Sequence, residues 1–271
     1  MVVSEGWNKT PPQIIDLQSG EVVTSLKNPD PEVIYPTGSW SNDGLTVASG
    51  TYPRFYTVFW DPETGLELAR SEVVEGFMKN AQFSPDDSML AAPTIFAEGN
   101  SPIYLIDTHT GKTVRKLPSE NGWSMVAYWS PDGETLAVGY QSGVIKLWDT
   151  KTWSVVKKFE AHLAAVWDLC WSPNGQRIIS GDDNSQVLVW EVDTGEVVLS
   201  WDMQGLLAGG FNDTDWSPDG QFVSIHGTGD IPYIKRVWQS TEELINYAYD
   251  CCVWRELSAE EREQFGLPVK K

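Results

Sequence analysis

The chain is poor in cysteine and histidine, the residues that most often build metal sites and disulfide frameworks. Only 3 Cys and 3 His occur in 271 residues. The cysteines stand at positions 170, 251 and 252, an odd number without C-x-x-C spacing. This pattern predicts neither a disulfide scaffold nor a zinc site, and we expect no metal and no other cofactor. Such sparse cysteine usage favours a cytoplasmic protein.

Long apolar runs and basic residues are also scarce. No stretch approaches 18 consecutive apolar residues, and Met1–Gly6 lacks the basic and apolar regions of a signal peptide. There are 19 Lys and Arg against 38 Asp and Glu, a formal net charge of −19. A surface this acidic repels phosphate groups. We therefore expect no nucleic-acid partner and no membrane partner.

Tryptophan, in contrast, is abundant, and many of the 14 Trp belong to an internal repeat. An aromatic residue followed by Ser and a turn-forming triplet returns five times, at spacings of 43, 46, 42 and 45 residues. Pro, Asp or Asn, and Gly in this order favour a reverse turn between two strands. The copies are Trp40-Ser41-Asn42-Asp43-Gly44, Phe83-Ser84-Pro85-Asp86-Asp87, Trp129-Ser130-Pro131-Asp132-Gly133, Trp171-Ser172-Pro173-Asn174-Gly175 and Trp216-Ser217-Pro218-Asp219-Gly220.

A second repeated feature follows each aromatic by about 20 residues. The spacing of 42 to 46 residues between units is typical of repeat proteins. It is a short apolar run that usually ends in Trp and an acid, and a Thr-Gly turn follows in most copies. Each unit then holds four short strands, which indicates an all-β radial or closed arrangement. The runs are Val58-Phe59-Trp60-Asp61, Tyr104-Leu105-Ile106-Asp107, Leu147-Trp148-Asp149, Val189-Trp190-Glu191 and Val237-Trp238-Gln239.

These units resemble the WD-repeat blades of a β-propeller. The resemblance covers residues 1–239 and implies five recognisable four-stranded blades behind a partial N-terminal one. Met1 aligns inside the second strand of that partial blade, and the last unit is cut short after its third strand, which gives 22 strands in total. We expect upstream sequence or a second chain to complete the propeller, with an incomplete but tolerated first blade as the alternative. The resemblance also makes His162 a structural residue and places Asn184 where the family has an Asp.

Residues 240–271 form a separate helical tail in this interpretation. Ser240-x-x-Glu243 is a capping box, and apolar residues at helical spacing predict a helix over 241–252. A second short helix is expected from Ser258. The tail resembles the segment after the last blade of bacterial multidomain WD-repeat signalling proteins, whose signalling domain lies upstream. We expect it to pack on the propeller, with a detachable partner-binding helix as the alternative.

No catalytic constellation is found. The segment Gly122-Trp123-Ser124-Met125-Val126 fails the nucleophile pattern G-x-S-x-G at its last position. The sequence therefore predicts a non-catalytic interaction or sensor module, the C-terminal part of a larger bacterial signalling protein. Two alternatives stay open: a hydrolase-like enzyme with a central-channel site that includes Asp215 or His226, and a self-assembling structural subunit.

Binding residues are expected in loops, because a rigid scaffold holds loops without constraining their sequence. In propellers of this resemblance, partners meet the loops before the first strand and between the second and third strands. Here those loops carry aromatic and charged side chains that suit a basic or amphipathic protein partner. The predicted partner-binding residues are Tyr52, Arg54, Phe77, Trp123, Tyr140, Asp182, Asp183 and Phe211; Phe96 and Glu120 lie in the same loops, and Trp167 is assigned to the core.

Overall fold

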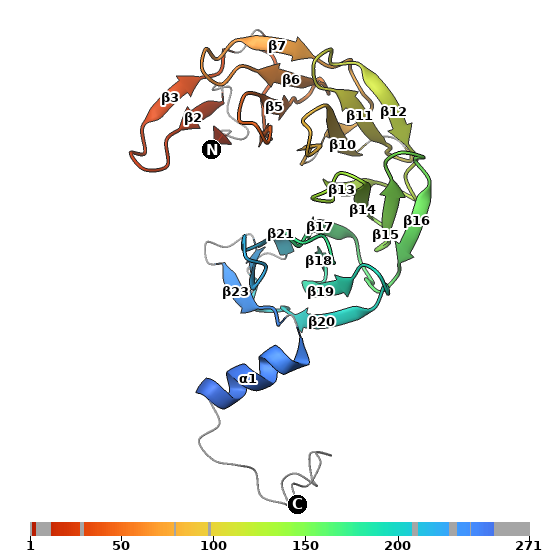
Figure 1. Ribbon diagram of the computed structural model, residues 1–271. Helices are drawn as coiled ribbons and strands as arrows, with labels where there is room; N and C mark the ends of the chain where they lie inside the picture. The colour runs from red at the N-terminus through yellow and green to blue at the C-terminus, as the bar shows by residue number, and fades with distance from the viewer. Residues whose placement is uncertain are drawn as a thin grey trace, which may run out of the picture.

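The strands form antiparallel sheets that follow one another around an arc (Figure 1). The computed structural model describes residues 2–3, 12–27, 30–78, 80–96, 99–207, 211–227, 232–238 and 240–251. Across these residues there are six sheets. First strands such as β13, β17 and β21 lie toward the inside of the arc, and fourth strands such as β12, β16 and β20 lie on its outer rim. The all-β propeller architecture predicted from the repeats is confirmed.

The element bounds follow the repeat along the chain. The first two sheets contain β1 (Val2–Val3), β2 (Gln13–Ile15) and β3 (Val22–Ser25), then β4 (Ser39–Trp40), β5 (Val47–Gly50), β6 (Thr57–Trp60) and β7 (Glu67–Arg70). The third contains β8 (Phe77–Met78), β9 (Gln82–Phe83), β10 (Met89–Ile95), β11 (Ile103–Asp107) and β12 (Thr113–Leu117), with β8 and β9 both paired to β10. The fourth contains β13 (Ser124–Trp129), β14 (Thr135–Tyr140), β15 (Ile145–Asp149) and β16 (Val155–Phe159). The last two contain β17 (Val166–Trp171), β18 (Arg177–Asp182), β19 (Gln186–Glu191) and β20 (Val197–Asp202), then β21 (Phe211–Trp216), β22 (Phe222–Gly227) and β23 (Tyr233–Arg236).

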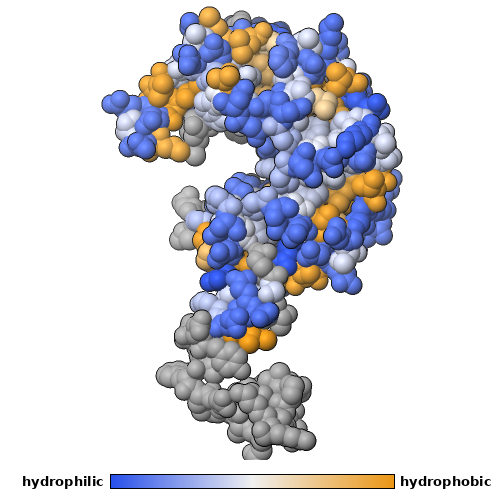
Figure 2. Space-filling model, viewed as in Figure 1, coloured by the Kyte–Doolittle hydropathy of each residue, from blue (hydrophilic) through white to orange (hydrophobic). Residues whose placement is uncertain are grey.

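Burial differs between the middle and the outer strands of a sheet. Strands β5 and β6 are buried at every residue, because both faces of a middle strand pack on neighbouring sheets. Strand β7 alternates between half-buried and exposed residues, as expected for an outer strand with one solvated face. Aliphatic side chains on the outer strands, Val156 among them, remain exposed, and Figure 2 shows apolar surface along the outer rim.

The first turn of each unit is held by its serine. Ser130 Oγ donates to Asp132 Oδ1 at 2.6 Å and accepts from the Thr135 backbone N–H at 2.9 Å. Four further turns repeat the bond between the serine and the acid or amide two residues later: Ser41 with Asp43, Ser84 with Asp86, Ser172 with Asn174 and Ser217 with Asp219. The predicted hairpins are therefore present, and local side-chain chemistry fixes them.

Successive first turns also touch one another. A Cβ placed on Gly133 would lie 3.6 Å from the Pro85 ring of the preceding sheet. The corresponding distance is 3.7 Å for Gly175 over Pro131 and for Gly220 over Pro173. Each proline ring thus packs on the glycine of the next sheet.

The second turn uses the acid at the end of the third strand. Asp107 Oδ1 accepts from the backbone N–H of Thr110 at 2.8 Å and from its hydroxyl at 2.7 Å. Gly111 follows with a φ of +70°, and a Cβ there would lie 2.1 Å from the Arg70 carbonyl oxygen of the preceding sheet. Only glycine satisfies both the left-handed backbone and this close approach.

The fifth sheet contains a buried polar network. His162 lies 3.1 Å through Nδ1 from Asp182 Oδ2 and 2.7 Å through Nε2 from Ser180 Oγ. Ser180 Oγ also accepts from Trp190 Nε1 at 2.8 Å. His162 thus has the structural position that we predicted. The acid of the network, however, is Asp182; the expectation that Asn184 takes this position is wrong, because Asn184 lies two residues beyond, in the turn, with its backbone N–H donating to Asp182.

A single helix follows the last sheet within the described residues: α1 (Thr241–Cys251), close to the predicted 241–252. The Ser240 hydroxyl caps it by accepting from the Glu243 backbone N–H at 3.1 Å. The Arg236 guanidinium lies 4.3 Å from the Trp238 ring centroid and 4.9 Å from that of Tyr247. These contacts join α1 to the end of β23, although the helix points away from the arc in Figure 1. The second predicted helix, from residue 258, lies outside the described residues.

Candidate interaction face

The start of each first strand and the end of each second strand lie at the same end of a sheet, because neighbouring strands are antiparallel. In the fourth sheet, Ser124 at the start of β13 pairs with Tyr140 at the end of β14. In the third sheet, Phe77 of β8 pairs with Ile95 of β10. We call this end of the sheets, with its connecting segments, the loop face. It contains the loops in which the sequence predicted partner-binding residues.

Two aromatic residues of adjacent sheets meet on the loop face. The ring centroids of Phe96, after β10, and Trp123, before β13, lie 4.9 Å apart in an edge-to-face arrangement. Phe96 is 64% exposed, whereas Trp123 is half-buried and packs on the hydrophobic core. A backbone bridge between Ser101 and Trp123 fixes the two segments together. We call the Phe96 and Trp123 pair the aromatic shelf.

The backbone at Phe96 is in an unusual conformation. Its φ is +61°, in the left-handed region that bulky residues rarely occupy. The aromatic shelf therefore keeps an apolar ring in solvent on a strained backbone. Phe77, in the paired strand, is half-buried and packs on the same core as Trp123, so it supports the shelf more than it extends it.

Tyr52 and Arg54 belong to a second part of the loop face, between β5 and β6. Tyr52 is 40% exposed and lies 6.0 Å from the Phe55 ring. The Arg54 guanidinium contacts Asp30 Oδ2 at 2.8 Å and Glu32 Oε2 at 2.7 Å. Both predicted residues are at the surface, but Arg54 is neutralised by two carboxylates of its own chain.

The acidic residues of the loop face differ in how they are paired. Glu120 contacts Lys146 Nζ at 2.6 Å and Lys158 Nζ at 3.1 Å. Burial acts to raise the pKa of Glu120, but the hydrogen bonds from the two lysines outweigh it and hold the pKa below its usual value. Asp183 is exposed, as predicted, and its carboxylate accepts from the indole N–H of Trp167, which is half-buried at the edge of the core.

Two predicted partner-binding residues are not at the surface. Tyr140 and Asp182 are both 0% exposed, so the prediction that they contact a partner is wrong. Both end the second strand of a sheet, one residue after a glycine that pairs with the third strand. At this register the side chain points between sheets, where it meets Trp148 or His162 instead of solvent. Phe211 begins β21, but its side chain lies outside the described residues.

The described residues show neither a metal-binding cluster nor a membrane-spanning helix. They contain no group of three or more His, Cys, Asp or Glu side chains that could hold a metal ion. None of the helices formed by these residues is long and apolar enough to cross a membrane.

Comparison with known proteins supports the architecture. The family model described as "IFT140 first beta-propeller" matches residues 69–203. A chain in a solved structure titled "Crystal Structure of Mitotic Checkpoint Complex" matches with a TM-score of 0.74 and 20% sequence identity, over 88% of this chain and 73% of that chain. No curated protein matches the sequence. The fold of this chain is therefore that of a β-propeller.

Proposed function

We propose that the protein is a non-catalytic protein-interaction module that binds a protein partner through the loop face. The observation that carries this proposal is the aromatic shelf, in which Phe96 stays 64% exposed beside Trp123 on a left-handed backbone. Exposed aromatic anchors on a rigid scaffold are typical of interaction hot spots. Unusual backbone conformations also concentrate at binding sites. The similar solved chain belongs to a complex by its title, in keeping with such a role.

The chemistry of the loop face suggests what the partner presents. Glu120 and Arg54 are already paired within the chain, so neither supplies an open charge. Asp183 remains exposed, and the chain as a whole has a formal charge of −19. A partner segment with an apolar side chain for the aromatic shelf and basic residues around it satisfies both features. This is the basic or amphipathic partner that the sequence predicted.

The wider context of the proposal rests on the tail resemblance. The helix after the last sheet supports that resemblance, and we place this propeller in a larger bacterial signalling protein in the cytoplasm. The first and last sheets each contain three strands among the described residues. An additional segment or a second chain that pairs with one of them would extend the arc.

Site-specific photo-crosslinking tests the proposal. A photoreactive phenylalanine analogue replaces Phe96 in one protein and Val156, an exposed outer-strand residue, in another. We expect a discrete crosslinked partner from position 96 and none of the same mass from position 156. Adding Trp123→Ala to the position 96 protein should remove that product, because the shelf loses its supporting ring. Equal crosslinking from both positions would reject the loop face as the binding surface.

A further inference from the structure

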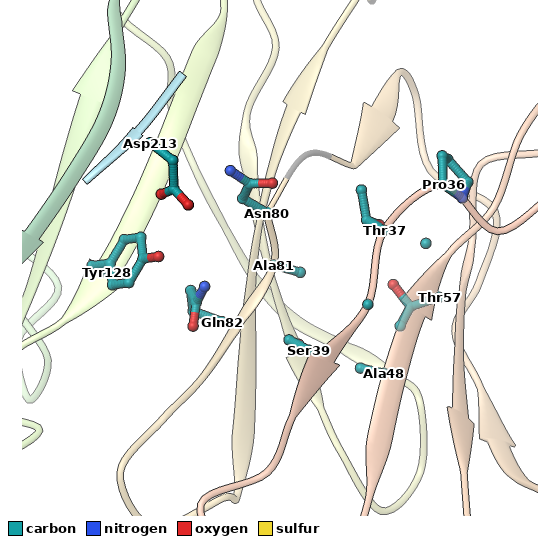
Figure 3. A pocket seen from close by; sticks show the side chains of 12 residues that line it. Pro36, Thr37, Ser39, Ala48, Thr57, Asn80, Ala81, Gln82, Tyr128 and Asp213 are labelled. Carbon is teal, nitrogen blue, oxygen red and sulfur yellow. The ribbon is translucent and has the colours of Figure 1, made fainter. Parts of the chain in front are cut away.

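A polar cavity of about 250 Å³ opens on the inner side of the arc (Figure 3). Four sheets contribute to its lining: the second through Gly50 and Thr57, the third through Gln82, the fourth through Tyr128 and the sixth through Asp213. It is separate from the loop-face residues considered above. Because sequence-distant strands form its walls, the assembled arc creates this cavity and no single repeat does.

Four polar groups point toward a common space on one side of this cavity. Figure 3 shows the carboxylate of Asp213 and the hydroxyl of Tyr128 on one side of this space, with the amide groups of Asn80 and Gln82 beside them. The amide nitrogen of Asn80 lies on the side of Asp213, and rotation of either amide brings its oxygen, a hydrogen-bond acceptor, to that side. The opposite wall adds Ser39, whose hydroxyl is buried without a hydrogen-bond partner among the described residues. A guest with several N–H donors fits such a lining.

The backbone turns Asn80 toward this space. Asn80 has a φ of +45° and lies between β8 and β9, where the first strand of the third sheet is interrupted. The first strands β13 and β17 run without a break over six residues each. Asn is among the few residues that tolerate the left-handed conformation, but it still carries a cost there. The break places an amide group in the cavity where a continuous strand would not.

The cavity carries a negative charge. Asp213 Oδ1 accepts from the Thr214 backbone N–H at 3.0 Å, and Asp213 forms no ion pair with any described cationic side chain. Burial raises the pKa of the neighbouring Asp215, and repulsion by Asp213 adds to the effect, although hydrogen bonding and His226 act against it. Burial also raises the pKa of Tyr128, with the charges of Asp168, Asp213 and Asp215 in the same direction. A cation in this space would meet a favourable potential.

We propose that the cavity binds an alkylguanidinium group, with Asp213 as its counter-ion and with Asn80, Gln82 and Tyr128 as neutral acceptors. A guanidinium presents five N–H donors in one plane, which suits a carboxylate with neutral acceptors around it better than a compact ammonium does. A volume of about 250 Å³ suits a single side-chain-sized group. The group can come from a free arginine-like molecule or from an arginine of a protein partner. The proposal does not depend on the loop face.

Calorimetric titration of the full chain tests the proposal. The probes are N-acetyl-arginine amide and N-acetyl-citrulline amide, which have nearly the same shape but differ in charge. We expect the arginine probe to bind with a Kd of about 1 mM or below and the citrulline probe to bind at least about tenfold more weakly. Equal affinity for both probes, or no binding of the arginine probe, would overturn the proposal. An ammonium probe that binds more tightly than the arginine probe would overturn the assignment to guanidinium.

Two variants place the interaction in the cavity. Asp213→Asn removes the charge from an exposed position, so the fold should persist, and we expect a loss of about tenfold in affinity. Asn80→Gly keeps a residue that accepts the left-handed backbone but removes the amide, and it should also weaken binding. Asp219→Asn, in a turn outside the cavity, is the matched control and should bind like the parent. Unchanged affinity in both cavity variants would reject the site.

A third probe, a ten-residue peptide with one central arginine, distinguishes a free arginine-like molecule from an arginine of a protein partner. Tighter binding of the peptide than of the arginine amide, reduced by Trp123→Ala, supports an arginine of a protein partner. Equal binding of both, with no effect of Trp123→Ala, supports a free small molecule. Both interpretations require that Asp213→Asn weakens binding of the probe. If it does not, both are rejected.

Discussion

The Tyr140 hydroxyl lies 3.3 Å from Trp148 Nε1, at the strand position that Asp182 occupies in the next sheet. In the fourth sheet a neutral phenol accepts from the tryptophan. In the fifth sheet the tryptophan donates to Ser180, and the carboxylate at that position meets a histidine. The fourth and fifth sheets, two copies of the same repeat, thus provide different acceptors for a buried indole N–H.

Removal of this acceptor should destabilise the protein. Tyr140→Phe leaves the buried Trp148 N–H unsatisfied, and we expect a loss of about 1–3 kcal/mol in the free energy of unfolding. Urea denaturation measures the change. Tyr52→Phe, at a partly exposed position, is the control and should shift stability by less than about 0.5 kcal/mol. If Tyr140→Phe left the free energy of unfolding unchanged, water or a rearranged side chain would have to replace the phenol as acceptor.

The acids of the first turns should make stability depend on acid pH. The Ser130 hydroxyl, and then the Glu134 backbone N–H, hold the pKa of Asp132 below its ordinary value of 3.8. A carboxyl whose pKa is lowered by folding stabilises the folded state above its unfolded pKa, and this contribution is lost as the pH falls through the folded pKa. Asp132→Asn should remove that part of the pH dependence below 3.8.

The chain offers its own control for this titration. Asn174 accepts from the Ser172 hydroxyl at 2.7 Å, so an amide supports the same turn without a titrating group. Asn174→Asp should therefore gain the acid dependence that Asp132→Asn loses. Unfolding free energies measured between neutral pH and roughly pH 3 compare the two variants with the parent. Parallel pH curves for all three proteins would contradict the assignment.

Gly111 should tolerate no side chain. A Cβ at this residue would lie 2.1 Å from the Arg70 carbonyl oxygen and would also occupy a backbone with a φ of +70°. Gly44 has a φ of +72° but nothing within 4 Å of its Cβ position, so Gly44→Ala measures the cost of the backbone conformation alone, about 1–2 kcal/mol. We expect Gly111→Ala to exceed it by about 1–3 kcal/mol in thermal or urea unfolding. Similar losses in both variants would mean that the two sheets move apart freely.

Arg236 should hold α1 against the last sheet. Its guanidinium lies over Trp238 and Tyr247 and contacts Glu243 at 3.2 Å. Arg236→Lys keeps a positive charge but loses the planar stacking, a loss of about 0.5–1 kcal/mol at this half-buried position. Amide hydrogen exchange in α1 should then accelerate by about two- to fivefold. Glu243→Gln removes the ion pair but keeps the ring stacking of Arg236, and it should have a smaller effect. The reverse order would assign the docking to the salt bridge.

The sequence predicted the parts of the fold that local chemistry determines. The serine turns, the acid-threonine turns and the capped helix each depend on residues a few positions apart, so their patterns are legible in one chain. Loop residues were harder. The sequence pattern placed Tyr140 and Asp182 in loops after a strand, whereas each is the last residue of its strand. The exact register decides whether such a side chain points to solvent or between sheets.

The central cavity had no sequence signal at all. Asn80, Tyr128 and Asp213 belong to three different sheets, and nothing in their spacing brings them together. The sequence placed Phe96 in a loop but did not predict its left-handed backbone or its contact with Trp123. Both features depend on the folded structure.

The contact of Pro85 with Gly133 is repeated twice along the arc, and each time it joins the first turns of two consecutive sheets. Each such contact joins only neighbouring sheets, so a change in the spacing at one contact would displace every sheet beyond it. A larger side chain at one of these glycines would act as a wedge on this edge, tilt all the sheets beyond it and change the radius of the whole arc. We therefore expect the curvature of the molecule to depend on these five-residue turns, so that a single substitution in one of them shifts sheets far along the chain.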